Sequence, residues 1–191
     1  MKKSIYTIIL VFTTLLNFAQ SSEHLLFKGV PIDGTLLQYI NKMKENGLSL
    51  IQSKDGTAFL KGDFAGYKDC IVGVSTLNQK DLVYKIGVVF PDNDSWSSLS
   101  NYYFNIKDLL IEKYGEPTNV VEKFDEETDD DNLKFLKVKL DNCTYFSTWQ
   151  TNKGNIQLSI KHSNSSSCFI RLTYFDKING EKIKAKAKSD L

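Results

Sequence analysis

The chain has 191 residues, of which 41% are hydrophobic and 25% charged, and its formal net charge is +1. This composition is typical of a globular protein, and a chain of this size can bury enough surface to fold without a metal or a disulfide. A near-neutral charge gives no indication of nucleic acid or of an anionic membrane as a partner.

The first 20 residues predict a cleavable export signal. Lys2 and Lys3 form a positive start, an uncharged apolar run covers residues 5–18, and Ala19 is a small residue suited to cleavage. The run is shorter than the roughly 20 residues that span a bilayer, so we expect no membrane span after cleavage. We therefore expect a mature chain that begins within residues 20–22 and is periplasmic or secreted; an uncleaved membrane anchor is the alternative.

Helical and alternating patterns follow one another along the rest of the chain. Apolar residues at helical spacing predict a helix over residues 33–46, capped at its start by Asp33 or Thr35, and a second helix over residues 95–114. A glycine directly follows each predicted helix, as is common at helix ends. Alternating patterns between turn signals predict strands over residues 57–61, 67–76, 82–90, 119–124, 143–150, 155–162 and 168–175.

This order predicts an α+β fold of two tandem helix-plus-antiparallel-sheet units (α-βββ repeats) after a signal peptide. Residues 21–94 are assigned to the first unit and residues 95–191 to the second, with an insertion near residues 124–141. The last strands of the two units suggest an internal repeat, because apolar residues occupy matching positions in 86–92 and 170–176. Chance similarity between two short alternating strands is the alternative.

Two such units in tandem resemble the β-lactamase inhibitory protein family in the order of their elements over residues 25–176. No contact residue of that family matches a position here, so the resemblance implies no site. The chain also resembles uncharacterised exported proteins of Gram-negative bacteria. A shared order of elements does not transfer a function in either case.

His162 and Cys168 flank a polar loop and are predicted to face each other across two adjacent strands. A thiolate needs a nearby base, which an imidazole can supply, and Asn164 could orient the ring. This pair defines the alternative function, a thiol-dependent hydrolase. The other interpretation is a hairpin end with a buried cysteine and a half-buried histidine. No family signature surrounds the pair, so we expect a protein that is not an enzyme.

No cofactor and no metal are expected. Two histidines and three scattered cysteines give no zinc spacing. The acidic stretch 125–131 could attract Ca²⁺ but lacks the ligand spacing of a calcium loop, and a solvated insertion is its other interpretation. Cys143 and Cys168 are predicted on strands separated by a third strand, which is too far for a disulfide.

The face opposite the core in the last two strands is the candidate binding site. Phe169, Arg171 and Phe175 share that face of the last strand, and Lys161 is expected beside them on the neighbouring strand. Aromatic side chains around a cation suit an acidic or aromatic protein surface. We therefore expect a non-catalytic protein-binding or inhibitor-like module whose partner is another protein. A plain solvated face, or a cover formed by residues 124–141, is the alternative.

Overall fold

The computed structural model describes residues 23–77, 80–163 and 167–189 of the chain. The export signal predicted at residues 1–20 lies outside the described residues. Part of the loop between His162 and Cys168, including Asn164, lies outside them as well.

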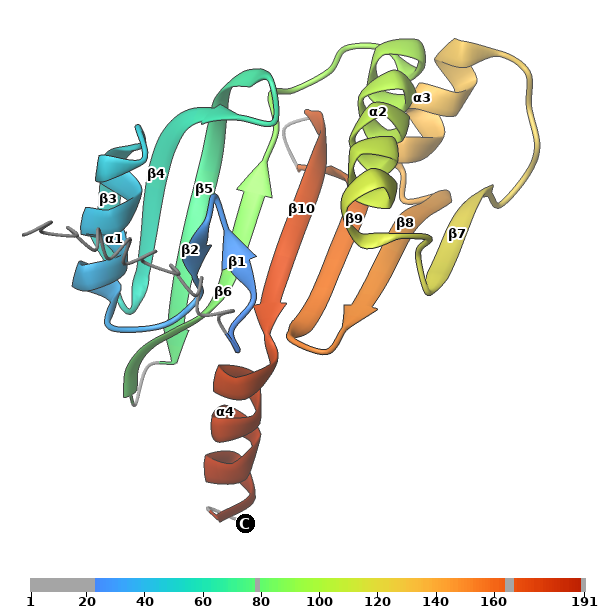
Figure 1. Ribbon diagram of the computed structural model, residues 1–191. Helices are drawn as coiled ribbons and strands as arrows, with labels where there is room; N and C mark the ends of the chain where they lie inside the picture. Colours follow the sequence, from blue (N-terminus) through green and yellow to red (C-terminus); the bar gives the residue numbers. More distant parts are fainter. Residues whose placement is uncertain (1–22, 78–79, 164–166, 190–191) are drawn as a thin grey trace, which may run out of the picture.

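An eight-stranded antiparallel sheet forms the centre of the fold, and the predicted α+β class is confirmed (Figure 1). The strands are β3 (Ser49–Lys54), β4 (Thr57–Phe64), β5 (Tyr67–Leu77), β6 (Lys80–Val89), β7 (Asn119–Phe124), β8 (Cys143–Thr151), β9 (Gly154–His162) and β10 (Cys168–Asp176). Their order across the sheet is β3-β4-β5-β6-β10-β9-β8-β7. Two meanders therefore meet where β6 pairs with β10, with Val88 opposite Leu172.

Helices α1 (Leu36–Glu45) and α2 (Trp96–Tyr114) cover one face of this sheet (Figure 1). The short hairpin of β1 (Leu26–Phe27) and β2 (Val30–Pro31) lies on the same side. The helix α3 (Asp131–Lys139) packs against α2. The helix α4 (Lys177–Ser189) continues from the end of β10. Thr35 caps α1, where Gln38 completes a capping box, and Ser95 caps α2. Both caps satisfy backbone N–H groups that would otherwise lack a partner.

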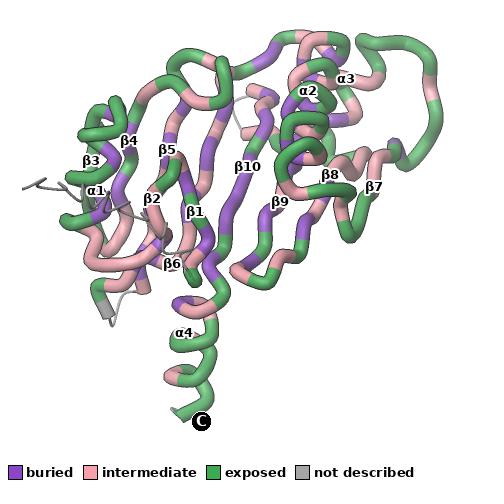
Figure 2. The backbone as a smooth tube through the Cα atoms, in the orientation of Figure 1, coloured by how far each residue is buried: buried purple, intermediate pink, exposed green. Residues whose placement is uncertain are grey.

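One buried cluster joins the two helices to the sheet. Tyr39 and Met43 of α1 and Leu99 and Tyr103 of α2 are fully buried in this cluster. The strands β4, β5, β6, β9 and β10 contribute their inward-facing apolar side chains to it. Figure 2 shows buried segments that alternate with half-buried and exposed ones along β4, β5, β6, β9 and β10. A sheet with one buried face produces this pattern, so the opposite face of the strands is the accessible one.

The residues assigned to two units share this one sheet and this one core. Ile86 and Ile170, which occupy matching positions in the proposed repeat, are both fully buried. The boundary proposed at residue 94 falls between β6 and α2. The repeat and the division into units stay predictions.

Several elements were not predicted from the sequence. The strand β3 has six exposed residues and a β-bulge between Leu50 and Gln52, so it lacks the strict alternation that marks a half-buried strand. The acidic stretch leads into α3, where the carboxylate of Asp130 accepts hydrogen bonds from the backbone of Asn132 and Leu133. Acidic residues here serve as a helix cap.

Candidate binding site on the open face of the sheet

The face opposite α1 and α2 carries the four residues proposed as a binding site. Phe169 lies opposite Lys161 in the register of β10 and β9, and Arg171 and Phe175 follow on the same face of β10. Arg171 and Lys161 are exposed, Phe175 is 37% exposed and Phe169 is half-buried. Neither phenylalanine is therefore buried, which leaves this face accessible.

Lys161 and Arg171 line one hollow of about 350 Å³. The hollow forms where β8 and β9 separate. These strands pair as far as Phe146 and Ser159, and beyond that point residues 143–145 of β8 pair with β7. Strand pairing brings the two cations to one side of the hollow, on neighbouring strands.

The other walls of this hollow are mostly polar. The Nε2 atom of His162 lies 3.0 Å from Oδ1 of Asp141, so a histidine–carboxylate pair stands at one end. Burial, with the nearby Asp125 carboxylate, raises the pKa of the Cys143 thiol to about 11, so this wall carries a neutral thiol at pH 7. The side chain of Gln157 adds a hydrogen-bonding amide. Such a hollow suits a small anionic group, for example a carboxylate side chain.

The two phenylalanines lie at opposite ends of β10. Six residues of a strand correspond to roughly 20 Å. Phe175 lines a separate hollow of about 580 Å³ at the start of α4, and Nζ of Lys85 lies 5.9 Å from the centre of its ring. The structure thus brings Lys161, Arg171 and Phe169 together, and it places Phe175 with Lys85 further along the same face.

The three central strands carry only positive charge on this face. Its positions are Lys85, Gly87 and Val89 on β6; Phe169, Arg171, Thr173 and Phe175 on β10; and Asn155, Gln157, Ser159 and Lys161 on β9. These positions hold three cations and no carboxylate. No side chain projects from this face at Gly87, which pairs with Gly73. A side chain added at Gly87 would meet open space. A partner can therefore approach the strands closely.

Cys168 and His162 lie directly opposite each other in the β9–β10 register. Burial raises the pKa of the Cys168 thiol, and the side chain is fully buried. The imidazole of His162 is instead within 3.0 Å of Asp141. A buried thiol with a raised pKa is a poor nucleophile, so this geometry does not favour thiol catalysis.

A polar cluster that the sequence did not reveal lies between α2 and the β7–β8 pair. The hydroxyl groups of Tyr103 and Ser147 are 2.8 Å apart, and Glu122 accepts from Tyr103 at 3.1 Å and forms an ion pair with Lys107. Burial raises the pKa of Tyr103, which keeps the phenol protonated. The carboxylate neutralises the lysine, so these residues satisfy one another inside the fold. Their spacing in the chain gives no signal of this proximity.

Comparison with models of protein families, with curated proteins and with solved structures found no match for this chain. Within residues 23–77, 80–163 and 167–189, no helix combines the length and the hydropathy needed to cross a membrane. The same residues contain no group of three or more histidine, cysteine or acidic side chains placed to hold a metal ion. What supports the binding site is therefore its geometry and its charge.

Proposed function

We propose that this protein is an exported, non-catalytic module that binds an acidic region of another protein through the open face of its sheet. The observation that carries the proposal is the charge of the three central strands, where Lys85, Lys161 and Arg171 face outward with no carboxylate among them. Complementary charge guides protein association and sets its specificity. Arg171 adds a fork of donors that matches a carboxylate, and exposed aromatic rings supply apolar contact.

The periplasmic or secreted location of this module rests on the signal-like sequence at residues 1–20. The proposed module is inhibitor-like in the sense that a partner surface held against this face is closed to other molecules. The two meanders that meet at β6 and β10 are compatible with an internal repeat. The raised pKa of the buried Cys168 thiol supports a binding function over a thiol hydrolase.

A capture experiment with matched charge reversals tests this proposal. Tagged protein, expressed with its signal and recovered from the periplasm or the medium, is incubated with the envelope fraction of the native organism. The test variant carries Lys161→Glu and Arg171→Glu, and the control carries Lys42→Glu and Lys113→Glu, two exposed lysines of α1 and α2. Both variants change the net charge equally, so only the position of the change differs.

We expect the open-face variant to lose a partner that the wild type and the control retain, by about tenfold in captured amount. Raised salt should weaken capture of the same partner by the wild type. Equal capture by all three proteins would contradict the role of the open face. Recovery of the protein only from the cytoplasm with an intact Met1 would contradict export.

A further inference from the structure

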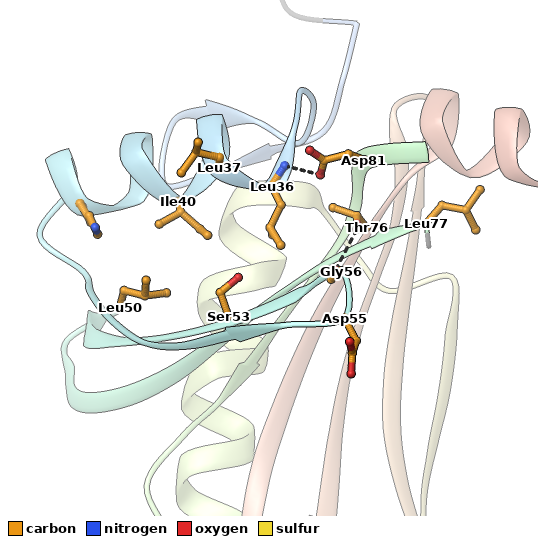
Figure 3. A pocket seen from close by; sticks show the side chains of 11 residues that line it. Leu36, Leu37, Ile40, Leu50, Ser53, Asp55, Gly56, Thr76, Leu77 and Asp81 are labelled. Carbon is orange, nitrogen blue, oxygen red and sulfur yellow. Dashed lines mark hydrogen bonds between the residues drawn. The ribbon is translucent and has the colours of Figure 1, made fainter. Parts of the chain in front are cut away.

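A separate groove lies on the other side of the sheet, between α1 and β3 (Figure 3). Its volume is about 820 Å³. Leu36 and Ile40 of α1 face Leu50 and Ser53 of β3 across it. Leu50 is 39% exposed, and Leu37 at the rim is 66% exposed. Both walls of this groove therefore expose aliphatic side chains to water. An apolar partner that bound here would bury these side chains, which is favourable.

The floor of the groove belongs to an end strand of the sheet. In the part of the chain that the structure describes, β3 pairs with β4 alone, so the outer row of its backbone N–H and C=O groups has no strand partner. The β-bulge after Leu50 puts Leu50 and Ser53 on the α1 side, opposite Leu60 and Ala58 of the core. An extended chain along β3 could therefore pair with its backbone and place alternate side chains in the groove.

The opposite end of the sheet shows a different arrangement. There α2, which has 19 residues, packs on β8, β9 and β10, and its Tyr103 and Lys107 side chains reach Glu122 of the end strand β7. The helix α1 has only 10 residues and ends at Glu45. The shorter helix α1 contributes no comparable polar cluster beside β3 in the described residues, and the groove lies at this position.

The charges of the groove differ between its two ends. Lys44, in the last turn of α1, lies at the end where β3 begins, and it has no ion pair among the described residues. Asp55 and Asp81 lie at the end where β3 finishes. Asp81 accepts a hydrogen bond from the backbone N–H of Leu36 through one oxygen, at 2.9 Å. A bound chain therefore meets the carboxylate of Asp81 at one end and an ammonium group at the other, while Oδ2 of Asp55 at the first end lies 3.9 Å from Nζ of Lys54.

From these features we propose that the groove binds an extended apolar segment of a partner protein, added as a strand antiparallel to β3. In that direction the N-terminal end of the segment lies near Asp55 and Asp81, and its C-terminal end lies near Lys44. The segment has a basic residue towards its start, aliphatic residues at alternate positions and an acidic residue towards its end. This site is independent of the open face, with which it shares no residue.

Synthetic peptides test the site directly. The probe is the capped peptide K-T-V-T-V-T-E, in which the lysine, both valines and the glutamate share one face of the strand. Its binding is followed through the NMR shifts of backbone amides in β3 and α1 of the full protein. One control peptide has the two charged residues exchanged, and a second carries N-methyl groups on alternate backbone nitrogens, which prevents strand pairing. Leu37→Asp and Leu50→Asp alter the groove, and Leu109→Asp alters a leucine on α2 whose exposure (47%) lies between those of the two groove leucines.

We expect the probe to shift amides of β3 and α1, with binding about tenfold weaker in either groove variant and unchanged in Leu109→Asp. Lys44→Glu should abolish the preference for the probe over the charge-exchanged peptide, because each peptide then has one attracted and one repelled end. Arg171→Glu should leave probe binding unchanged. Equal binding of the N-methylated peptide, or shifts confined to other elements, would overturn the proposal. Self-association that Leu50→Asp abolishes would overturn it too, because a second copy of the chain would then occupy the groove.

Discussion

Replacement of Asn179 by leucine should weaken the fold, because this side chain ties the start of α4 to two distant segments. Asn179 is fully buried, and its side-chain nitrogen lies 3.1 Å from the carbonyl oxygen of Ile32 and 2.9 Å from that of Val83. Leucine has a similar size but no donor, so both carbonyls would lose a partner. An unsatisfied buried group costs about 1–3 kcal/mol, so two such groups give a loss of about 2–6 kcal/mol in the free energy of unfolding.

Urea unfolding measures this loss through the fluorescence of Trp149, which is buried and donates a hydrogen bond to the carbonyl of Gly115 at 2.8 Å. With a slope of about 2 kcal/mol per molar urea, the midpoint should fall by about 1–3 M. Asn101→Leu, at an exposed position of α2, is the matched control and should change stability by less than about 0.5 kcal/mol. An unchanged midpoint for Asn179→Leu would refute the reasoning.

Three further predictions concern other parts of the core. Tyr39→Phe should raise the free energy of unfolding by about 1 kcal/mol, because this buried hydroxyl has no partner among the described residues, whereas Tyr103→Phe should lower it. Gly154→Ala should cost at least about 2 kcal/mol, since the added carbon would lie 2.1 Å from the Phe175 carbonyl oxygen; Gly87→Ala is the control with open space. Burial raises the pKa of both thiols, so iodoacetamide should label Cys143 and Cys168 slowly at pH 7, and Cys143 faster as the pH approaches 11. Equal effects of the two tyrosine variants would contradict the first prediction, and equal effects of the two glycine variants would contradict the second. Rapid labelling of either cysteine at pH 7 would contradict the third.

The long helix and most strands follow from local sequence signals. The apolar stripe of α2 predicted the helix, and Gly115, whose φ is 81°, ends it where expected. The strand β7 occupies the residues that were predicted, and β10 extends the prediction by one residue. These elements could be predicted because their periodicity and their turn residues agree with the final fold.

Other elements depend on contacts that are distant in the sequence. The strand β3 is held by pairing with β4, and none of its six residues is buried, so no alternation marks it. The helix α4 begins where the backbone N–H of Asn179 donates to the buried carboxylate of Asp176. That carboxylate also accepts from the backbone N–H of Leu25 at 2.9 Å. A contact between residues 151 positions apart cannot be inferred from local patterns.

The candidate binding site shows the same division. Alternation along β9 and β10 predicted that Lys161 and Arg171 face away from the core, and both are exposed on that face. The hollow between them was not predicted, because it forms only where β8 leaves β9 to pair with β7 alone. Phe175 is separated from this hollow by the length of the strand. Alternation along a strand predicts the face on which a residue lies and not its distance from another residue on that face.

The two proposed surfaces lie on opposite faces of the sheet, and this arrangement has a physical consequence. Arg171 projects from the open face near the centre, whereas Leu50 projects towards α1 at the outer strand. Sites that are far apart and share no partners contribute independently to binding. A protein that presented both an acidic surface and an extended apolar segment could therefore engage both sites, and the linked contacts would raise its affinity above that of either site alone. Such a partner should lose affinity in two separable steps, one with Arg171→Glu and the other with Leu50→Asp.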